Sequence, residues 1–341
     1  MNAPTLAVSM GDPAGVGPEI IVKAWAALRE SGPPFLVVGD FDALGAAARG
    51  GASLLRRIGS PAEAAAVFPS ALPVLDAPMQ GQVVAGKPSS SYAPAVIRWI
   101  ETAVGLALSG AVAGLVTAPI AKAPLYEAGF PFPGHTEFLG ELTQAQQHSG
   151  PRGPVMMLAT PGLRVTLVTI HEPLSAVPAL LRQDKIVEVG LITARALAED
   201  FGIDRPRLAV AALNPHAGEG GALGREEIEI ITPACARLRG LGVDCADPRP
   251  ADSLFHEEAR RSYDAVVCMY HDQALIPVKM LDFWGGVNVT LGLPIVRASP
   301  DHGVAYDIAG RGVARADSLI AAIRLAAEIV NNRAAARARA A

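Results

Sequence analysis

The sequence predicts an α/β fold with a mostly parallel sheet. Short apolar runs rich in β-branched residues alternate with amphipathic stretches rich in alanine and leucine. Of the 341 residues, 50% are hydrophobic and only 18% are charged, so the chain can bury a sizeable core. Continuous apolar runs bounded by glycine or proline are typical of strands that helices cover on both faces.

The predicted strands and helices alternate along the chain. The strands are residues 6–10, 35–39, 113–119, 155–160, 165–171, 207–214 and 265–271. The helices are residues 18–30, 92–109, 178–201, 225–240 and 316–333. Pro18 suits a first helical turn, because the N–H that proline lacks has no partner inside the helix there.

The length predicts two lobes with a discontinuous division of the chain. We expect residues 1–130 plus 285–341 in lobe one and residues 131–284 in lobe two, with the functional site in the cleft between them. Segments 129–154 and 285–312 are rich in glycine, proline and polar residues. They are predicted as long irregular loops, which are often functional.

Charge and cysteine content exclude several classes of protein. The net charge is -4 and the basic residues are scattered, so we expect no nucleic-acid partner. Three cysteines without CxxC spacing fit a reducing compartment. No apolar run reaches 18 residues, and the N-terminus lacks the basic region of a signal peptide. We therefore expect a cytoplasmic protein without membrane contact.

Three of the seven histidines, His171, His216 and His271, end predicted strands. Because the carboxyl ends of parallel strands meet at one edge of a sheet, these imidazoles could bind one cation. Three protein ligands with one open position are typical of a catalytic metal site, and imidazole favours zinc, cobalt, nickel or iron. For each histidine alone, the alternative is a hydrogen-bonded residue at a loop end.

Acidic residues lie near these histidines in the sequence. Asp272 follows His271 directly, Glu219 follows His216, and Asp252 lies in a loop. Each is either a carboxylate that orients an imidazole, a ligand from a neighbouring subunit, or a solvated loop acid.

Several other segments carry candidate anion-binding groups. The motif MGDPAGVGPE, residues 10–19, either places backbone N–H groups against an anion or forms a tight turn. His135 and Thr136 lie in a Gly/Pro-rich segment, where the alternative is a helix start with Thr136 as N-cap. Lys279, Asn288 and Arg297 flank an apolar turn and suit a substrate that carries phosphate and carboxylate groups.

Six motifs, in this order, resemble the 4-hydroxythreonine-4-phosphate dehydrogenase family of vitamin B6 synthesis. They are MGDPAGVGPE, GHTEFL, LNPHAGEGG, GREE, MYHDQALIPVK and GVNVTLGLPIVRASPDHGVAYDIAGRG. The resemblance extends from about residue 6 to about residue 330. Residues 302–312 also resemble the NAD-binding loop of isopropylmalate and isocitrate dehydrogenases, so the resemblance implies their two-lobed fold.

The resemblance implies a homodimer whose active sites use residues of both subunits, with dimer contacts in lobe two. It implies one divalent metal per site, zinc, cobalt or magnesium, and NAD or NADP as cofactor. It implies that the metal is bound by His171, His216 and His271, and that Asp252, Asp272 and Lys122 lie near it. The implied substrate contacts are His135, Thr136, Lys279, Asn288 and Arg297. The implied cofactor contacts are Gly292, His302, Gly303 and Asp307.

The implied reaction is oxidation of 4-phosphooxy-L-threonine at C3, followed by loss of carbon dioxide to give 3-amino-2-oxopropyl phosphate. Lys279, His135 and a metal-bound hydroxide are alternative acceptors of the hydroxyl proton. Related family members imply another substrate, 4-phosphothreonate or 4-phosphoerythronate. A metal-dependent hydrolase and a non-catalytic phosphate-ester binding protein are further alternatives.

Overall fold

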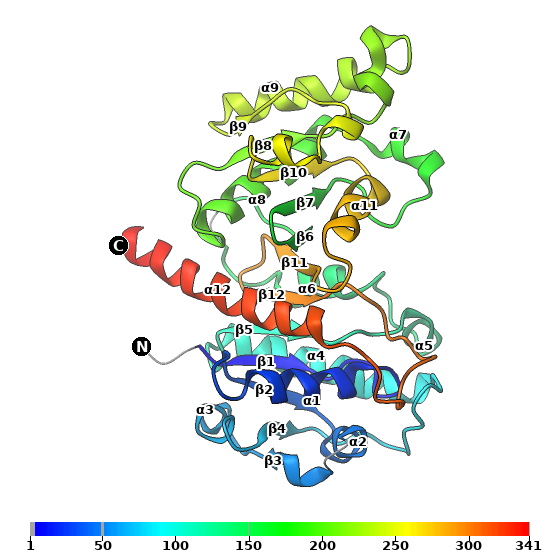
Figure 1. The fold of residues 1–341 in the computed structure, drawn as a ribbon, viewed down its shortest axis with the longest axis vertical. Helices are drawn as coiled ribbons and strands as arrows, with labels where there is room; N and C mark the ends of the chain where they lie inside the picture. The colour runs from blue at the N-terminus through cyan, green and yellow to red at the C-terminus, as the bar shows by residue number, and fades with distance from the viewer. Residues whose placement is uncertain (1–3, 49–50, 149, 341) are drawn as a thin grey trace. The chain divides into compact units, whose positions relative to one another are not determined.

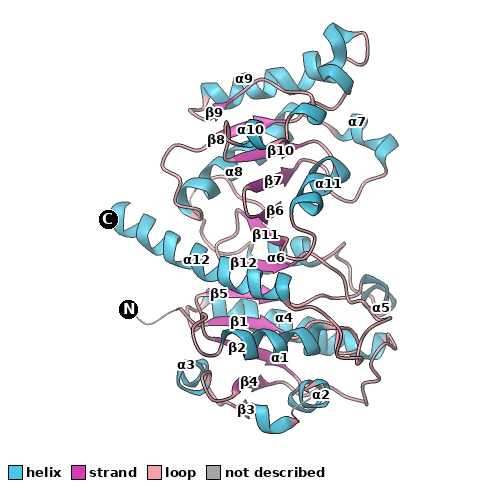
Figure 2. Cartoon of the chain, viewed as in Figure 1, coloured by secondary structure: helices cyan, strands magenta, loops and turns pink. Residues whose placement is uncertain are grey.

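The computed structural model describes residues 4–48, 51–148 and 150–340 and divides the chain into two compact units. Unit one comprises residues 1–147 and 293–331, and unit two comprises residues 148–292 and 332–341. The predicted lobes divide the chain at 130/131 and 284/285, whereas the units divide it at 147/148, 292/293 and 331/332. Figures 1 and 2 show the elements of both units.

Unit one is built on six strands in the order β3-β4-β2-β1-β5-β12, and all its pairings are parallel. Helix α4 packs against β1 and β2, and α1 lies on the viewer's side of these strands in Figure 1. The strands are β1 (Leu6–Ser9), β2 (Phe35–Gly39), β3 (Leu55–Arg57), β4 (Leu72–Asp76), β5 (Gly114–Thr117) and β12 (Arg297–Pro300). The helices are α1 (Gly17–Leu28), α2 (Phe41–Ala47), α3 (Ala64–Val67), α4 (Ala93–Leu108), α5 (Lys122–Glu127), α6 (His135–Thr143) and the first part of α12 (Asp317–Ala340).

Two tryptophans anchor the core of unit one. Trp25 of α1 and Trp99 of α4 are fully buried among the apolar side chains of the strands. Their indole N–H groups donate to the carbonyl oxygens of Phe68 and Ala77, each at 2.8 Å. The core therefore gains large apolar area without leaving a buried donor unpaired.

Unit two contains a mixed sheet in the order β11-β6-β7-β10-β8-β9. β6 is antiparallel to β11 and β7, and the other pairings are parallel. The strands are β6 (Val155–Thr160), β7 (Leu163–Leu167), β8 (Arg207–Val210), β9 (Asp244–Cys245), β10 (Ala265–Cys268) and β11 (Val287–Leu291). The helices are α7 (Val177–Leu180), α8 (Gln183–Glu199), α9 (Thr232–Gly240), α10 (Glu257–Arg260), α11 (His271–Leu281) and the end of α12.

The predicted α/β class is confirmed, and each predicted strand and helix segment contains the expected element. The predicted helix 178–201 is interrupted, since Leu181 and Arg182 are extended between α7 and α8. The prediction of long irregular loops is wrong in part: 129–154 contains α6, and 285–312 contains β11 and β12. These two buried strands carry Asn288 and Arg297, which interrupt the apolar pattern that marks the other strands.

No helix in the described part of the chain has the length and apolar character needed to span a membrane.

Candidate active site

The N-terminal motif forms a tight turn whose backbone donors are used inside the protein. The N–H groups of Asp12 and Val16 donate to Pro119 O and Val304 O, each at 2.9 Å. Those of Ala14 and Gly15 donate to the Asp12 side chain and backbone at 2.9 and 3.1 Å. These contacts favour the tight turn over the anion-binding alternative.

Unit one contains a buried arginine. Arg297 is on β12 and is only 3% exposed. Its Nη2 donates to Oγ1 of Thr117, at the carboxyl end of β5, at 2.7 Å. Burial lowers the pKa of Arg297 to about 10, an effect that the charge of Glu137 opposes. The guanidinium therefore stays cationic at neutral pH in a poorly solvated position, where an anionic ligand is strongly favoured.

His135 is the first residue of α6 and lies in the field of Arg297. The alternative of Thr136 as N-cap is wrong, because Gly134 occupies that position and provides no side-chain cap. Burial, together with the charge of Arg297, holds the pKa of His135 well below its usual value. Its Nε2 is buried and has no hydrogen-bond partner among the described residues. The site thus presents a neutral imidazole with an unused polar atom.

Lys122 adds a second cation beside the start of α6. A Cβ on Gly134 would lie 3.6 Å from Cε and 3.9 Å from Nζ of Lys122. The positive end of the helix dipole, Lys122 and Arg297 give unit one the composition of an oxyanion site.

The neutral His135 predicts a loss of stability in acid. Its folded pKa is depressed, so the unfolded chain binds the proton more readily, and stability falls as pH drops below about 6.5. Between pH 7 and 5.5, His135→Gln should lose less stability than the wild type, by about 1 kcal/mol. Urea unfolding at both pH values measures this difference. An equal loss in both proteins would contradict the assignment.

In unit two, His171 and His271 are neighbours because their strands are in register. The last residues of β7 and β10, Leu167 and Cys268, are partners in the sheet. Just beyond the strands, the Thr169 hydroxyl donates a hydrogen bond to Met269 O at 2.7 Å, which keeps the two chain segments together. The two imidazole ring centres lie 5.6 Å apart. Asp272 Oδ1 lies 2.7 Å from Nδ1 of His271, which leaves Nε2 as the ligand atom of that ring.

His216 does not join this pair within the chain. Beyond β8, the carboxylate of buried Glu227 accepts hydrogen bonds from the N–H groups of Leu213 and Asn214, each at 2.8 Å. These bonds hold the chain where it leaves the end of β8. The following residues 216–220 all have positive φ values. His216 is exposed on this segment, which projects beyond the strands of unit two before α9 in Figure 1.

The pair fits a divalent metal in donor type and in spacing, since zinc binds imidazole nitrogen at about 2.1 Å. Within the described residues, however, no group of three or more His, Cys, Asp or Glu side chains is placed to hold a metal ion. The described residues of one chain therefore bring together two imidazoles, without a third side chain of these types beside them.

The other predicted residues are distributed over both units. In unit two, Asn288 is on β11 and its Oδ1 is buried without a hydrogen-bond partner in the described structure. Lys279 is on α11, with Nζ 5.4 Å from the Phe283 ring centre. Asp252 is exposed in the 3₁₀ turn Ala251–Ser253, and Gly292 follows β11 with φ +73°.

The residues predicted to bind the cofactor in unit one are exposed. His302, Gly303 and Asp307 lie after β12, and a Cβ on Gly303 would meet nothing within 4 Å.

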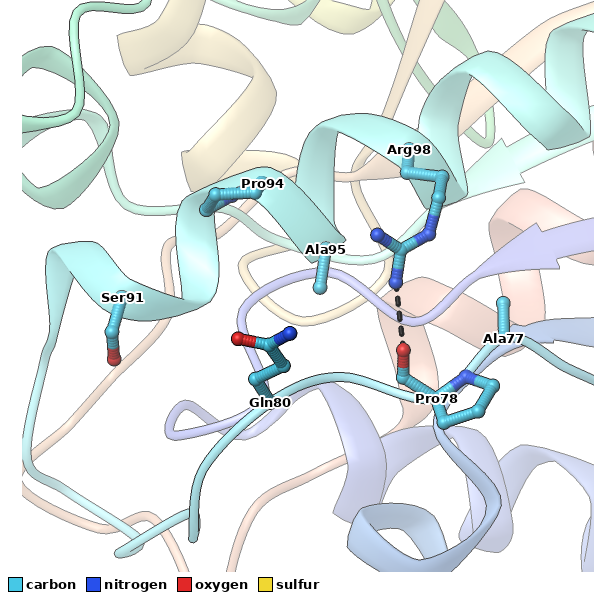
Figure 3. Close-up of a pocket in the computed structure, with 7 residues that line it drawn as sticks. All are labelled: Ala77, Pro78, Gln80, Ser91, Pro94, Ala95 and Arg98. Carbon is cyan, nitrogen blue, oxygen red and sulfur yellow. Dashed lines mark hydrogen bonds between the residues drawn. The ribbon is translucent and has the colours of Figure 1, made fainter.

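A cavity of about 420 Å³ lies beside α4, and Figure 3 shows its lining. None of the predicted site residues lines it. Its one cationic side chain, Arg98, donates to Pro78 O at 2.7 Å. The lining residues are Ala77, Pro78, Gln80, Ser91, Pro94, Ala95 and Arg98.

Sequence reasoning missed Thr117, Glu137 and Glu227. Thr117 is the last residue of β5 and lies near the end of the predicted strand 113–119, and its place near the carboxyl end of a parallel strand was the available signal. Glu137 and Glu227 lie on helical turns, and their contacts across the fold give no sequence pattern.

Together, these features define an α/β protein that combines a buried arginine and a buried neutral histidine with a pair of neighbouring histidines. The chain belongs to the family described as pyridoxal phosphate biosynthetic protein PdxA, whose model matches residues 31–326.

Full-length relatives agree with this assignment. The chain is 68% identical to "4-hydroxythreonine-4-phosphate dehydrogenase" of Caulobacter vibrioides, covering 98% of this chain and 99% of the relative. It is 56% identical to the protein of that name from Maricaulis maris, covering 96% and 98%. The crystal structure of the Klebsiella pneumoniae protein of that name superposes with a TM-score of 0.83 at 42% identity, covering 96% and 99%.

Proposed function

We propose that this chain is an oxidoreductase that oxidises 4-hydroxythreonine 4-phosphate with a nicotinamide cofactor in pyridoxal phosphate biosynthesis. Family membership and the 68% identical relative support this reaction. The structural observation that carries it is the buried Arg297 cation beside neutral His135, which suits an anionic substrate.

The substrate contacts are His135, Thr136, Lys279, Asn288 and Arg297. Arg297, Lys122 and the start of α6 neutralise an anionic group of the substrate. The buried Oδ1 of Asn288 accepts a hydrogen bond from a hydroxyl or amine group of the substrate. His135 is a poor proton acceptor, because Arg297 and burial disfavour its charged form. We assign removal of the C3 hydroxyl proton to Lys279, which accepts it as the neutral amine, with a metal-bound hydroxide as the alternative acceptor.

A divalent metal, zinc, cobalt or magnesium, is held by His171 and His271 of one chain and His216 of a second copy. Such an ion supplies Lewis-acid polarisation of the substrate oxygen. The 5.6 Å spacing of the first two rings and the exposure of His216 on its projecting segment support this arrangement. Asp272 orients His271, and Asp252 lies near the metal.

The second copy is supported by an exposed apolar face. On α11, Ile276 is 61% exposed and Met280, one turn later, is 80% exposed. Trp284, which follows the helix, is 51% exposed. Phe283, at the same end, is 61% exposed. Large apolar side chains of this kind are typical of a homodimer interface.

The cofactor, NAD or NADP, contacts Gly292, His302, Gly303 and Asp307. The exposure of the last three and the space beside Gly303 support this assignment. When bound, nicotinamide would supply the hydride acceptor for oxidation at C3, which gives a β-keto acid that can lose carbon dioxide.

Absorbance at 340 nm tests the proposal. With NAD or NADP and a divalent metal, 4-hydroxythreonine 4-phosphate should give a much larger kcat/KM than 4-phosphoerythronate or 4-phosphothreonate. Reduction with only one of the latter would keep the chemistry and change the substrate. Phosphate release without nicotinamide would instead indicate a hydrolase.

A further inference from the structure

A hydrogen bond from Tyr306 to Asp12 joins the segment after β12 to the N-terminal motif. Tyr306 Oη donates to Asp12 Oδ2 at 2.5 Å, and Asp12 Oδ1 accepts from Ala14 N at 2.9 Å. Asp12 is only 5% exposed, and burial raises its pKa while the Tyr306 hydroxyl opposes that shift. One carboxylate oxygen thus holds the motif and the other holds the segment.

The backbone between these contacts is strained. Ala305 has φ +44°, a left-handed conformation that a residue with a Cβ adopts only when its surroundings impose it. On one side, Val304 O accepts from Val16 N at 2.9 Å. On the other side is the Tyr306–Asp12 hydrogen bond. The two contacts fix the turn from both ends.

The far end of the segment is held by a second set of contacts from α1. Glu19 accepts from the N–H groups of Gly312 and Ala314 at 3.1 and 2.9 Å. Lys23 donates to Gly312 O at 3.0 Å and to Ala314 O at 2.6 Å. Close to the exposed residues 302, 303 and 307, the Tyr306 contact is the side-chain hydrogen bond that joins the segment to the N-terminal motif.

We propose that Tyr306, through its hydrogen bond to Asp12, is a positioning residue that sets the turn at Ala305 for binding of the nicotinamide cofactor. This inference rests on the proposed function, which assigns His302, Gly303 and Asp307 to the cofactor. Without the bond, Ala305 can relax to negative φ, and cofactor binding must restore the turn. Once the cofactor is bound, a protein that lacks this hydrogen bond presents the same reacting groups as the wild type.

The test compares Tyr306→Phe and Asp12→Asn with the wild type. Each variant should raise the Kd for NADH or NADPH, measured by fluorescence titration without substrate, by about tenfold. KM for the oxidised cofactor should rise in parallel, while kcat and KM for the phosphorylated substrate stay within about twofold. The double variant should bind no more weakly than Tyr306→Phe, because Asp12→Asn weakens the same contact that Tyr306→Phe removes.

Tyr263→Phe is the matched control. Its hydroxyl also donates to a single buried acceptor, Leu254 O at 2.9 Å, but in unit two. This variant should leave cofactor binding unchanged.

Three results would overturn the inference. Unchanged cofactor affinity in Tyr306→Phe, with an active wild type, refutes it and leaves the proposed function intact. If Tyr306→Phe and Tyr263→Phe lose cofactor affinity and thermal stability to the same extent, Tyr306 has only a general structural role. A wild type that binds neither cofactor nor substrate refutes the proposed function itself.

Discussion

Replacing either His216 or His271 by alanine is expected to lower turnover below about 1% of the wild-type value, because each removes a metal ligand. Both histidines are at least partly exposed, so the fold should survive. If His216 acts on the site of a second copy, co-expression of the two inactive variants should restore activity. Random pairing makes half the dimers mixed, with one intact site each, so about a quarter of the wild-type activity is expected.

Metal content and turnover of the purified variants and of the mixture are the measurements. His256→Ala is the control, because His256 is exposed and its Nδ1 only contacts Ala259 N at 3.5 Å. A mixture as inactive as its components would show that the three histidines do not combine across the dimer. Full activity in either single variant would remove that residue from the metal site.

Arg297→Met is expected to raise KM for the phosphorylated substrate by about a hundredfold. It removes a buried cation whose loss costs about 2–5 kcal/mol, and it roughly keeps the side-chain volume. KM for the nicotinamide cofactor should change by less than about twofold, because the residues assigned to the cofactor after β12 are exposed, whereas Arg297 is buried within the strand. Arg297→Lys should raise KM for the phosphorylated substrate less than Arg297→Met does, because it keeps the positive charge but lacks the two-pronged geometry of the guanidinium.

Initial rates at varied substrate and varied cofactor separate the two constants. Arg98→Met is a suitable control in the same unit, since Arg98 also donates a 2.7 Å hydrogen bond but lies at an exposed position. A larger effect on the cofactor constant than on the substrate constant would move Arg297 to the cofactor site.

The sequence predicts most of the fold because continuous apolar strands carry a strong signal. It misses β3, β4, β9, β11 and β12, and in the last two Asn288 and Arg297 replace apolar residues within the strands. These polar residues are also candidate substrate contacts, so the strand pattern fails at the proposed site.

For the site, strand ends predict the proximity of His171 and His271, because the parallel register of β7 and β10 places both residues at one edge. The same rule does not hold for His216. The chain leaves the edge where Glu227 binds two backbone N–H groups, and no local pattern signals that contact. The Tyr306–Asp12 bond joins residues 294 positions apart and is equally invisible in the sequence.

The most direct test of the central claim is the joint measurement of reduced cofactor and carbon dioxide formed from 4-hydroxythreonine 4-phosphate. Oxidation at C3 followed by decarboxylation predicts equal amounts of the two products, both dependent on added NAD or NADP. Inorganic phosphate released without either product would contradict the dehydrogenase assignment.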